Sequence, residues 1–141
     1  MRVRAETTVA APRDVVAGVY RDYARWPEVF PTIAAVRLLR EEPGRQLVEV
    51  DHRVEGKVVN ELVDRPPDGL ELREWKRAYD ASFVNRFEPV PGGTRFTVEG
   101  HLRLKGPRRL LSPFVRGHAR RLIERLQLQP IRSAAESRRD R

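Results

Sequence analysis

The stretch Ala10–Pro31, AAPRDVVAGVYRDYARWPEVFP, carries the signals of two short helices placed one after the other. Pro12 suits the first turn of a helix, where its missing N–H would have no partner, and Asp14 puts a carboxylate near the positive end of the helix dipole. Asp22 begins the second helix, which Pro31 closes. The apolar residues of the first helix recur at helical spacing, at Val15, Val16, Val19 and Tyr20.

Strand patterns lie on both sides of these two helices. Before them, residues 3–9 alternate between apolar and polar side chains, as in a half-buried strand. After them, strand and turn repeat about every 10–12 residues, with a Gly, Pro or Asp in each turn, which is typical of an antiparallel meander. The six predicted strands of this part are Ile33–Arg40, Leu47–Val54, Val58–Val63, Leu70–Arg77, Ala81–Glu88 and Thr94–Leu104.

The pattern becomes helical after Gly106-Pro107. Pro130 ends or bends this helix, and we expect residues 131–141 to be frayed helix followed by a disordered, basic tail. The predicted domain therefore spans residues 1–130. The apolar stripe of the helix is formed by Leu111, Val115, Ala119, Leu122 and Leu126.

This order of elements predicts an α+β protein in which a seven-stranded antiparallel sheet curls around one long C-terminal helix. Such a sheet has one apolar face that must be covered, and a single helix covers only a stripe of it. If the sheet curls, the two short helices close one end of the space inside. A sheet of this width tends to leave a hollow beside the helix, so the sequence predicts a cavity.

Composition excludes several classes of protein. The chain has 141 residues, 40% of them hydrophobic, which is enough for one packed domain. It has no cysteine, which excludes disulfides, thiolate nucleophiles and cysteine-ligated metals. No apolar run approaches the roughly 20 residues of a membrane span. The first residues lack the apolar core of a signal peptide, so we expect a cytoplasmic protein.

The net charge of +8 is concentrated at one end of the chain. The last 39 residues hold 12 Lys and Arg against 3 Asp and Glu. Such a segment indicates either an anionic partner or a solvated helix face. A nucleic acid is unlikely as that partner on chemical grounds, because the segment offers neither an aromatic platform nor a known recognition module.

Two motifs in the opening stretch resemble the START-like (SRPBCC) superfamily, most closely its polyketide cyclase/dehydrase and coenzyme Q-binding branches. They are the Ala-Pro opening of the first helix in Ala10–Val16 and the Asp-x-x-x-Trp-Pro-x-x-Phe-Pro pattern of Asp22–Pro31. Pro91–Thr94 and the long C-terminal helix match as well. The resemblance implies a helix-grip fold whose hydrophobic cavity takes lipids, quinones, hormones or nascent polyketides. Only some members of the superfamily are enzymes, so the resemblance leaves catalysis by this chain open.

Candidate cavity residues follow from strand pairing, since facing residues of antiparallel strands share a side of the sheet. A two-residue turn at Glu55-Gly56 pairs His52 with Val59. The same register pairs Val50 with Glu61. The inner face would then hold a histidine that titrates near neutral pH and a glutamate whose pKa burial would raise, which suits acid–base chemistry. The two side chains could instead bond each other or backbone groups, or lie at a wet mouth.

The later strands extend this predicted wall. The last hairpin points Phe83 and Asn85 inward on one strand and Val98 on the other, with Asn85 as the polar exception. The strand before it leaves one choice open. An inward Leu72 implies an inward Glu74 and an outward Trp75, whereas a one-residue bulge would bury Trp75 instead.

Two functions follow from the predicted cavity. The first is the binding of a hydrophobic small molecule, which is a polyketide, a quinone or a lipid. The candidate ligand-binding residues are Trp26, Phe30, Val50, Val59, Leu72, Phe83, Asn85, Phe87, Phe96, Val98, Val115, His118 and Leu122. The alternative is a polyketide aromatase/cyclase or dehydrase that acts on an acyl-carrier-bound poly-β-ketone. There His52 and Glu61 would move protons, and Arg65 would anchor the substrate. A third reading is an interaction protein whose cavity is filled by its own side chains.

The resemblance bears on the enzyme alternative residue by residue. Some aromatase/cyclases of the family carry a histidine followed by an acidic residue in the last strand, and here Leu102 follows His101, so the match is incomplete. They also place an arginine on the fourth strand, where Arg65 is the nearest equivalent. The arginine-rich helix could dock an acidic acyl carrier protein or touch an anionic membrane. We expect no cofactor and no metal, because the three histidines lack ligand spacing.

Overall fold

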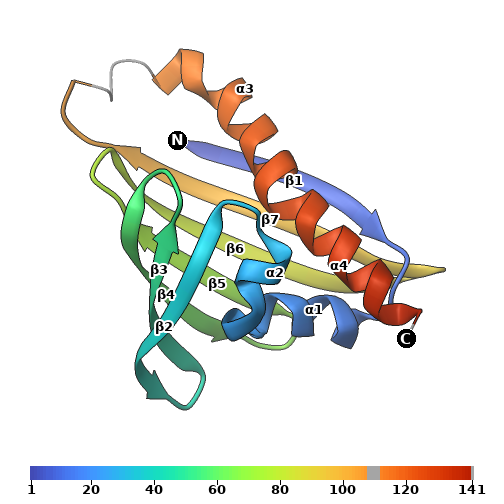
Figure 1. Cartoon of the computed structure of the whole chain (residues 1–141). Helices are drawn as coiled ribbons and strands as arrows, with labels where there is room; N and C mark the ends of the chain where they lie inside the picture. Colours follow the sequence, from blue (N-terminus) through green and yellow to red (C-terminus); the bar gives the residue numbers. More distant parts are fainter. Residues whose placement is uncertain (108–111, 141) are drawn as a thin grey trace.

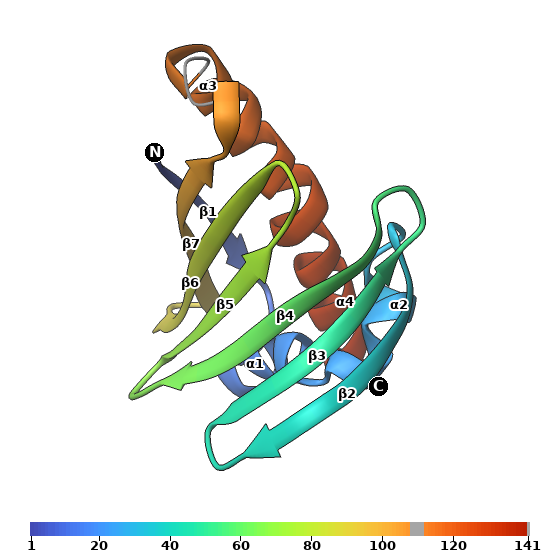
Figure 2. The same ribbon diagram turned by 90° about the vertical axis from the view of Figure 1, so that its left-hand side faces the viewer.

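Seven antiparallel strands form one curled, unclosed sheet in the order β1-β7-β6-β5-β4-β3-β2 (Figures 1 and 2). The structure, a computed structural model, describes residues 1–107 and 112–140, and the side chains of all of these except 112–115. Every strand from β2 to β6 pairs with the next one along the chain, which confirms the predicted meander. The strands are β1 (Arg2–Val9), β2 (Ile33–Glu42), β3 (Arg45–His52), β4 (Gly56–Arg65), β5 (Gly69–Trp75), β6 (Tyr79–Val90) and β7 (Gly93–Leu104).

Short helices carry the chain from edge strand β1 to the opposite edge, β2. They are α1 (Arg13–Arg21), the 3₁₀ turn η1 (Tyr23–Arg25) and α2 (Trp26–Val29). The indole Nε1 of Trp26 donates a buried hydrogen bond of 2.9 Å to the carbonyl oxygen of Tyr20. Since both residues are buried, this bond holds α2 against the end of α1. The two predicted short helices are therefore confirmed.

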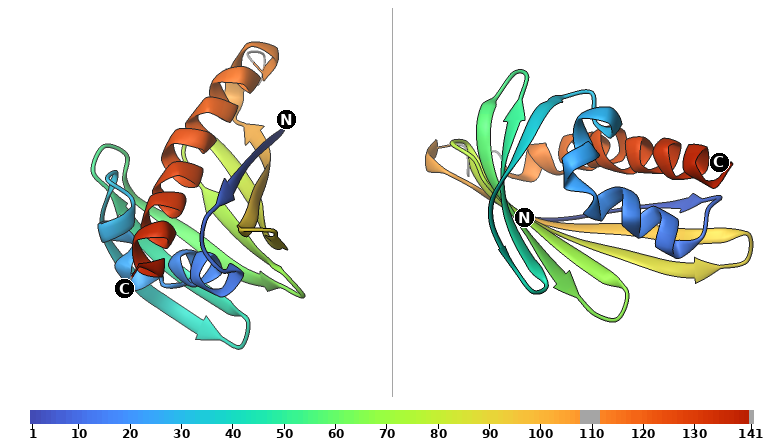
Figure 3. Two further views of the ribbon diagram at one scale, coloured as in Figure 1. Left: turned by 90° about the vertical axis from the view of Figure 1, so that its right-hand side faces the viewer. Right: turned by 60° about the horizontal axis from the view of Figure 1, so that its bottom comes forward.

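One long helical rod lies across the concave face of the sheet (Figures 1 and 3). It consists of α3 (Ser112–Ile123), the π-type segment η3 (Glu124–Leu128) and α4 (Gln129–Arg139). The prediction that residues 131–141 form a frayed and disordered tail was wrong for the part that is described. The wider π-type turn precedes Pro130 and leaves room for its ring beside the preceding carbonyl groups. Ile131 and Ala135, one turn apart, are fully buried and continue the apolar stripe against α1.

Aromatic rings fill the end of the molecule where α1 and α4 meet the sheet. The rings of Phe87 and Phe96 stack with their centroids 5.2 Å apart. Tyr20, from α1, meets each of them edge-on at 6.4 Å. Such offset and edge-on arrangements are the favourable ones for aromatic rings. This end of the space inside the sheet is therefore closed.

The β3–β4 hairpin differs from the predicted register. Residues 53–55 form its turn, and Val50 pairs with Val58. Gly56, with φ of 80°, follows this three-residue loop in the left-handed conformation that such loops require. The prediction of a two-residue turn was wrong: the turn is one residue longer and lies earlier in the chain, so Val50 pairs with Val58 instead of Glu61. This shift of three residues sends every side chain of β4 to the opposite face. The inward residues are Val58, Asn60 and Leu62, and the outward ones are Val59 and Glu61.

Candidate functional site

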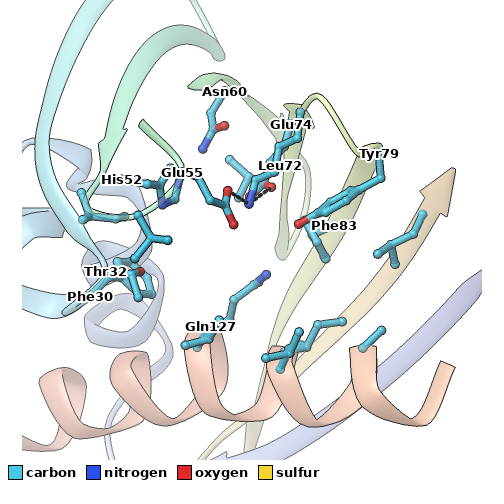
Figure 4. Close-up of a pocket in the computed structure, with 18 of the residues that line it drawn as sticks. Phe30, Thr32, His52, Glu55, Asn60, Leu72, Glu74, Tyr79, Phe83 and Gln127 are labelled. Atoms are coloured by element: carbon cyan, nitrogen blue, oxygen red, sulfur yellow. Dashed lines mark ion pairs between the residues drawn. The ribbon is translucent and has the colours of Figure 1, made fainter. Parts of the chain in front are cut away.

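A cavity of about 290 Å³ lies between the concave face of the sheet, the long helix and α2 (Figure 4). Its volume is at the lower end of the range of about 300–1,000 Å³ that ligand pockets occupy. Gly100, on β7, leaves room for the ring of Phe83, which a Cβ at this position would approach to 3.2 Å. The apolar wall is formed by Trp26, Phe30, Leu72, Phe83, Leu102, Ala119, Leu122 and Ile123.

The mouth of the cavity lies between the β3–β4 turn and the long helix. Val54, in the turn, is 94% exposed although it lines the cavity. Leu126, on the helix, is 38% exposed and also lines it. Exposed apolar side chains at a rim indicate where an apolar guest enters.

A lysine held between two carboxylates lies on the polar side of the cavity. The Nζ atom of Lys76, just after β5, is 2.7 Å from Oε2 of Glu55 and 3.5 Å from Oε2 of Glu74. It also lies 5.3 Å from the ring centroid of Tyr79, a distance typical of a cation–π contact. Glu74 is buried, whereas Glu55 belongs to the exposed turn at the mouth.

Burial and these ion pairs shift the pKa values in opposite directions. Burial raises the pKa of Glu74, and the nearby ammonium of Lys76 offsets only part of that rise. Burial alone would lower the pKa of Lys76, but the charge of Glu74 and the hydrogen bond that Lys76 donates to Glu55 outweigh it, so the pKa of Lys76 lies above its usual value. Burial, and then the charge of Lys76, lowers the pKa of His52. At neutral pH the cavity therefore holds a cationic lysine beside a neutral imidazole.

Several buried polar atoms at the cavity have no hydrogen-bond partner among the described residues. They are Nε2 of His52 on β3, Oδ1 of Asn60 on β4 and Oε1 of Gln127 in η3. Figure 4 shows Gln127 extending from the helix toward the sheet residues. Buried polar atoms are costly when they are left unpaired, so each one points to a missing partner. Polar groups on a guest molecule would provide such partners.

The hydroxyl of Tyr20 marks the inner end of the cavity. It accepts a buried hydrogen bond of 3.2 Å from Nδ2 of Asn85, which also donates to the carbonyl oxygens of Leu70 and Phe83. Burial, and then the charge of Glu74, raises the pKa of Tyr20 far above its usual value. The hydroxyl therefore keeps its proton at any physiological pH and can donate it to a neighbouring acceptor.

A family model described as "Polyketide cyclase / dehydrase and lipid transport" matches residues 1–136. The chain belongs to this family. The resemblance to the START-like superfamily and the predicted helix-grip fold are thereby confirmed. A search of curated proteins gives no match.

Solved structures with the same fold include aromatase/cyclases and a lipid transfer protein. The Zhui aromatase/cyclase from Streptomyces sp. R1128 has a TM-score of 0.77 at 19% identity, over 100% of this chain and 94% of that one. A STAR-related lipid transfer protein (fragment 25–204) from Xanthomonas axonopodis has a TM-score of 0.68 at 19% identity, over 94% and 84%. The di-domain ARO/CYC StfQ from the steffimycin biosynthetic pathway has a TM-score of 0.79 at 18% identity, over 97% of this chain and 51% of that one. The chain thus spans about half the length of StfQ. Identities this low show the fold alone.

In this polyketide cyclase/dehydrase family protein, the predicted site residues fall into three groups. Those that line the cavity are His52, Trp26, Phe30, Leu72, Phe83, His118 and Leu122. Those that lie in the closed core instead are Val50, Asn85, Phe87, Phe96 and Val98. Val59 is on the outer face of β4, and the side chain of Val115 lies outside the described residues. Phe87 and Phe96 of the core group pack against the ring of Tyr20, which also lines the cavity.

The structure overturns the placement of Glu61 and Arg65 in the cavity. Both point to the outer face because the true register of β4 is three residues away from the predicted one, and an odd shift exchanges the two faces. Glu61 receives hydrogen bonds of 2.6 Å from Arg45 and 3.1 Å from Arg73. Arg65 donates to Glu71 through Nε at 2.7 Å. These four groups and Glu71 form a polar cover over the outer face, and none of them can reach a guest in the cavity.

The residues that sequence reasoning missed are the polar ones around Lys76. The open choice on β5 is settled in favour of Glu74, because Asn60 pairs with Glu74 on the inner face and Trp75 is 46% exposed. The alternation Leu70, Leu72, Glu74 continues inward to Lys76, so the period of two could have found this lysine. No local pattern indicated Gln127, because its direction depends on the π-type turn.

Neither a metal site nor a membrane-spanning helix occurs in the described part of the chain. No group of three or more His, Cys, Asp or Glu side chains there could hold a metal ion. In the same residues, no helix combines the length and the apolar composition needed to cross a bilayer.

Proposed function

We propose that this protein binds a compact hydrophobic molecule that carries polar oxygen groups, in the cavity between the sheet and the long helix. The observation that carries the proposal is an apolar-walled cavity into which buried polar atoms point without partners. Burial of apolar area supplies about 25 cal/mol per Å² of free energy, and the polar atoms orient the guest. Aromatic polyketides and quinone rings suit the small volume better than a long acyl chain does.

Two measurements test the binding. Native mass spectrometry of the purified protein should show an added mass from a retained small molecule. Thermal unfolding should shift upward with aromatic polyketides or quinones, because a ligand that binds only the folded state stabilises it. A protein that carries no added mass and shows no thermal shift with either class would contradict the proposal.

A matched pair of variants places the guest in this cavity. Ala119→Phe adds a ring to the buried wall that the helix contributes, so it should abolish the thermal shift. Val59→Phe adds the same ring to the outer face of β4 and should leave the shift unchanged. Equal shifts in the two variants would place the guest elsewhere.

The second candidate function is a polyketide cyclase, which the ionisable groups in the cavity favour. In that reaction a base removes the α-proton of a β-ketone, and the enolate carbon attacks a second carbonyl group before water is lost. The carboxylate of Glu74 could act as the base, and the ammonium of Lys76 could stabilise the enolate oxygen. His52, neutral at the same wall, remains the candidate acid–base group that the sequence indicated.

The cyclase alternative has its own test. Glu74→Gln should slow the cyclisation of a thioester-bound poly-β-ketone by about 10²–10⁴-fold, the usual contribution of a general base. His52→Ala should reduce the rate as well, because it removes the second proton-transfer group. Product formation is followed by liquid chromatography with mass detection. Rates equal to that of the wild type in both variants would leave the binding function alone.

The arginine-rich side of the long helix supports an anionic partner. Arg116, Arg120, Arg121 and Arg125 are all exposed. Glu124 pairs with Arg120 at 3.2 Å, which leaves most of the positive charge of this side uncompensated within α3 and η3. The partner is an acidic acyl carrier protein if the chain is a cyclase, and an anionic membrane surface if it is a lipid or quinone carrier.

A further inference from the structure

The contact between Glu55 and Lys76 joins an exposed group to an enclosed one. The side chain of Glu55 is 51% exposed in the β3–β4 turn, whereas that of Lys76 is 13% exposed in the cavity wall. Their Oε2 and Nζ atoms are 2.7 Å apart. An ion pair with one solvated partner contributes little to stability, because that partner regains its hydration when the pair opens. Glu55 can therefore return to water at little cost to its own hydration, provided that another group compensates the charge of Lys76.

Lys76 cannot leave its place in the same way. The buried carboxyl of Glu74 lies 3.5 Å from Nζ, on the side away from the mouth, and the ring of Tyr79 lies beside it at 5.3 Å. An ammonium group in an apolar wall requires a compensating charge or acceptors. If Glu55 withdraws, Lys76 directs one unsatisfied N–H donor and a positive charge into the cavity.

We propose that Lys76 anchors an anionic oxygen of the guest, and that the carboxylate of Glu55 holds this position until the guest replaces it. The inference rests on the proposed binding function and names the class of guest: a hydrophobic molecule with a carboxylate or an acidic enol. The exchange leaves the charge around Lys76 unchanged, because one anion replaces another.

The surroundings of Lys76 match the rest of such a guest. Nε2 of His52 and Oε1 of Gln127 face the cavity without a partner in the described part of the chain, and both can accept a hydrogen bond from a hydroxyl group of the guest. Leu72 and Phe83 form an apolar wall for its rings. The cavity thus combines one cationic position with neutral polar atoms and a hydrophobic wall. This combination selects an acid with a hydrophobic body.

The test compares two ring probes of nearly the same shape by isothermal titration calorimetry at pH 7. 2-Naphthoate carries a carboxylate, and 2-naphthamide carries a neutral amide in its place. The wild type should bind the carboxylate at least about tenfold more tightly, since a hydrogen bond to a charged group is the stronger one. Lys76→Met should remove this preference and change the affinity for the amide by less than about twofold.

Three further variants make the comparison decisive. Lys57→Met removes the same charge from the outer face of β4, so it corrects for general attraction of anions to a basic protein and should keep the preference. Lys76→Met with Glu74→Gln avoids an unpaired buried carboxylate and should lose the preference while remaining folded. Glu55→Gln removes the competing carboxylate and should tighten binding of 2-naphthoate by up to about fivefold.

Two results would overturn the inference, and they can be told apart. If the wild type binds both probes with equal affinity, or if Lys76→Met weakens both equally, Lys76 is no anchor for an anion, while the binding function stands. If neither probe binds and no ring compound shifts the unfolding temperature, the binding function and the inference fail together.

Discussion

Glu71 and Glu74 lie three residues apart on β5, on opposite faces of the sheet, and their pKa values shift in opposite directions. Burial would raise the pKa of Glu71, but hydrogen bonds from Arg73, Ser82 and Arg65 lower it to about 2. Glu74 has only Lys76 to offset its burial, so its pKa is raised. The same residue type therefore acts as a structural anion on the outer face and as a more readily protonated carboxylate on the inner one.

The outer carboxylate should make stability depend on acid. Glu71 has a lower pKa in the folded state than its usual value of 4.5, so its contribution is present above pH 4.5 and is lost as the pH falls toward 2. Glu71→Gln should lower the free energy of unfolding by about 1–3 kcal/mol at pH 7. The difference from the wild type should shrink below pH 4.5. Urea unfolding of the wild type and the variant at pH 7 and at pH 3 measures this difference.

An exposed carboxylate of the same sheet provides the control. Glu88 is 58% exposed and pairs with Arg95 at 3.3 Å. Glu88→Gln should change stability by less than about 0.5 kcal/mol at either pH. A Glu71→Gln deficit that persists undiminished at pH 3 would show that the carboxylate charge is not its source.

The elements themselves could be predicted from the sequence, but the register of one hairpin could not. Periods of two and of about 3.6 located all seven strands, the short helices and the long helix as far as Pro130, since these patterns are local. Gly56, at the start of β4, suits a two-residue turn that includes it and a three-residue loop that it follows. That ambiguity moved Glu61 into the predicted cavity and Asn60 out of it. A single residue of turn length thus decides which side chains a guest would meet.

Alanine substitutions at two glycines test the conformation of the β3–β4 hairpin, with a glycine of helix α1 as the control. Gly56 ends the β3–β4 loop with φ of 80°, a conformation that costs a residue with a Cβ about 1–2 kcal/mol. Gly18 lies inside α1 with nothing within 4 Å of an added Cβ. Gly56→Ala should therefore destabilise the protein by about that amount, and Gly18→Ala should stabilise it by up to about 1 kcal/mol. Urea unfolding of both variants gives the comparison. A neutral Gly56→Ala would mean that the loop is not the one described.

At the scale of the whole molecule, the space inside the curled sheet is divided into a filled end and a hollow end. Rings from α1, β6 and β7 fill one end, and the cavity occupies the other, beside the first half of the long helix. The sequence predicted a hollow and much of its apolar wall. It could not predict the meeting of Glu55, Lys76 and Gln127, because these residues come together only through the curl of the sheet and the course of the helix. Long-range geometry of this kind has no local pattern.

The basic side of the long helix lies next to the mouth of this hollow end, which has consequences for docking. Arg121 and Arg125 are exposed and precede the cavity residues Leu122 and Leu126 in sequence. An anionic surface that attracts these arginines would bring the exposed Leu126 and Val54 of the mouth toward it. A hydrophobic guest could then pass between the surface and the cavity with little exposure to water.

Charge reversal should separate this docking from a general effect of net charge. Arg121→Glu with Arg125→Glu should weaken binding to phosphatidylcholine vesicles that contain phosphatidylserine by at least about tenfold, since each basic residue near such a surface contributes about 1 kcal/mol. Arg37→Glu with Arg40→Glu changes the net charge by the same amount on β2, the edge strand opposite to β1, which the long helix contacts. This pair should weaken vesicle binding less. Vesicle sedimentation measures both, and 1 M salt should abolish the binding, because it reduces the screening length to about 3 Å. Equal losses of vesicle binding in the two double variants would contradict a docking face on the helix. Binding to an acidic acyl carrier protein instead of to vesicles would favour the cyclase.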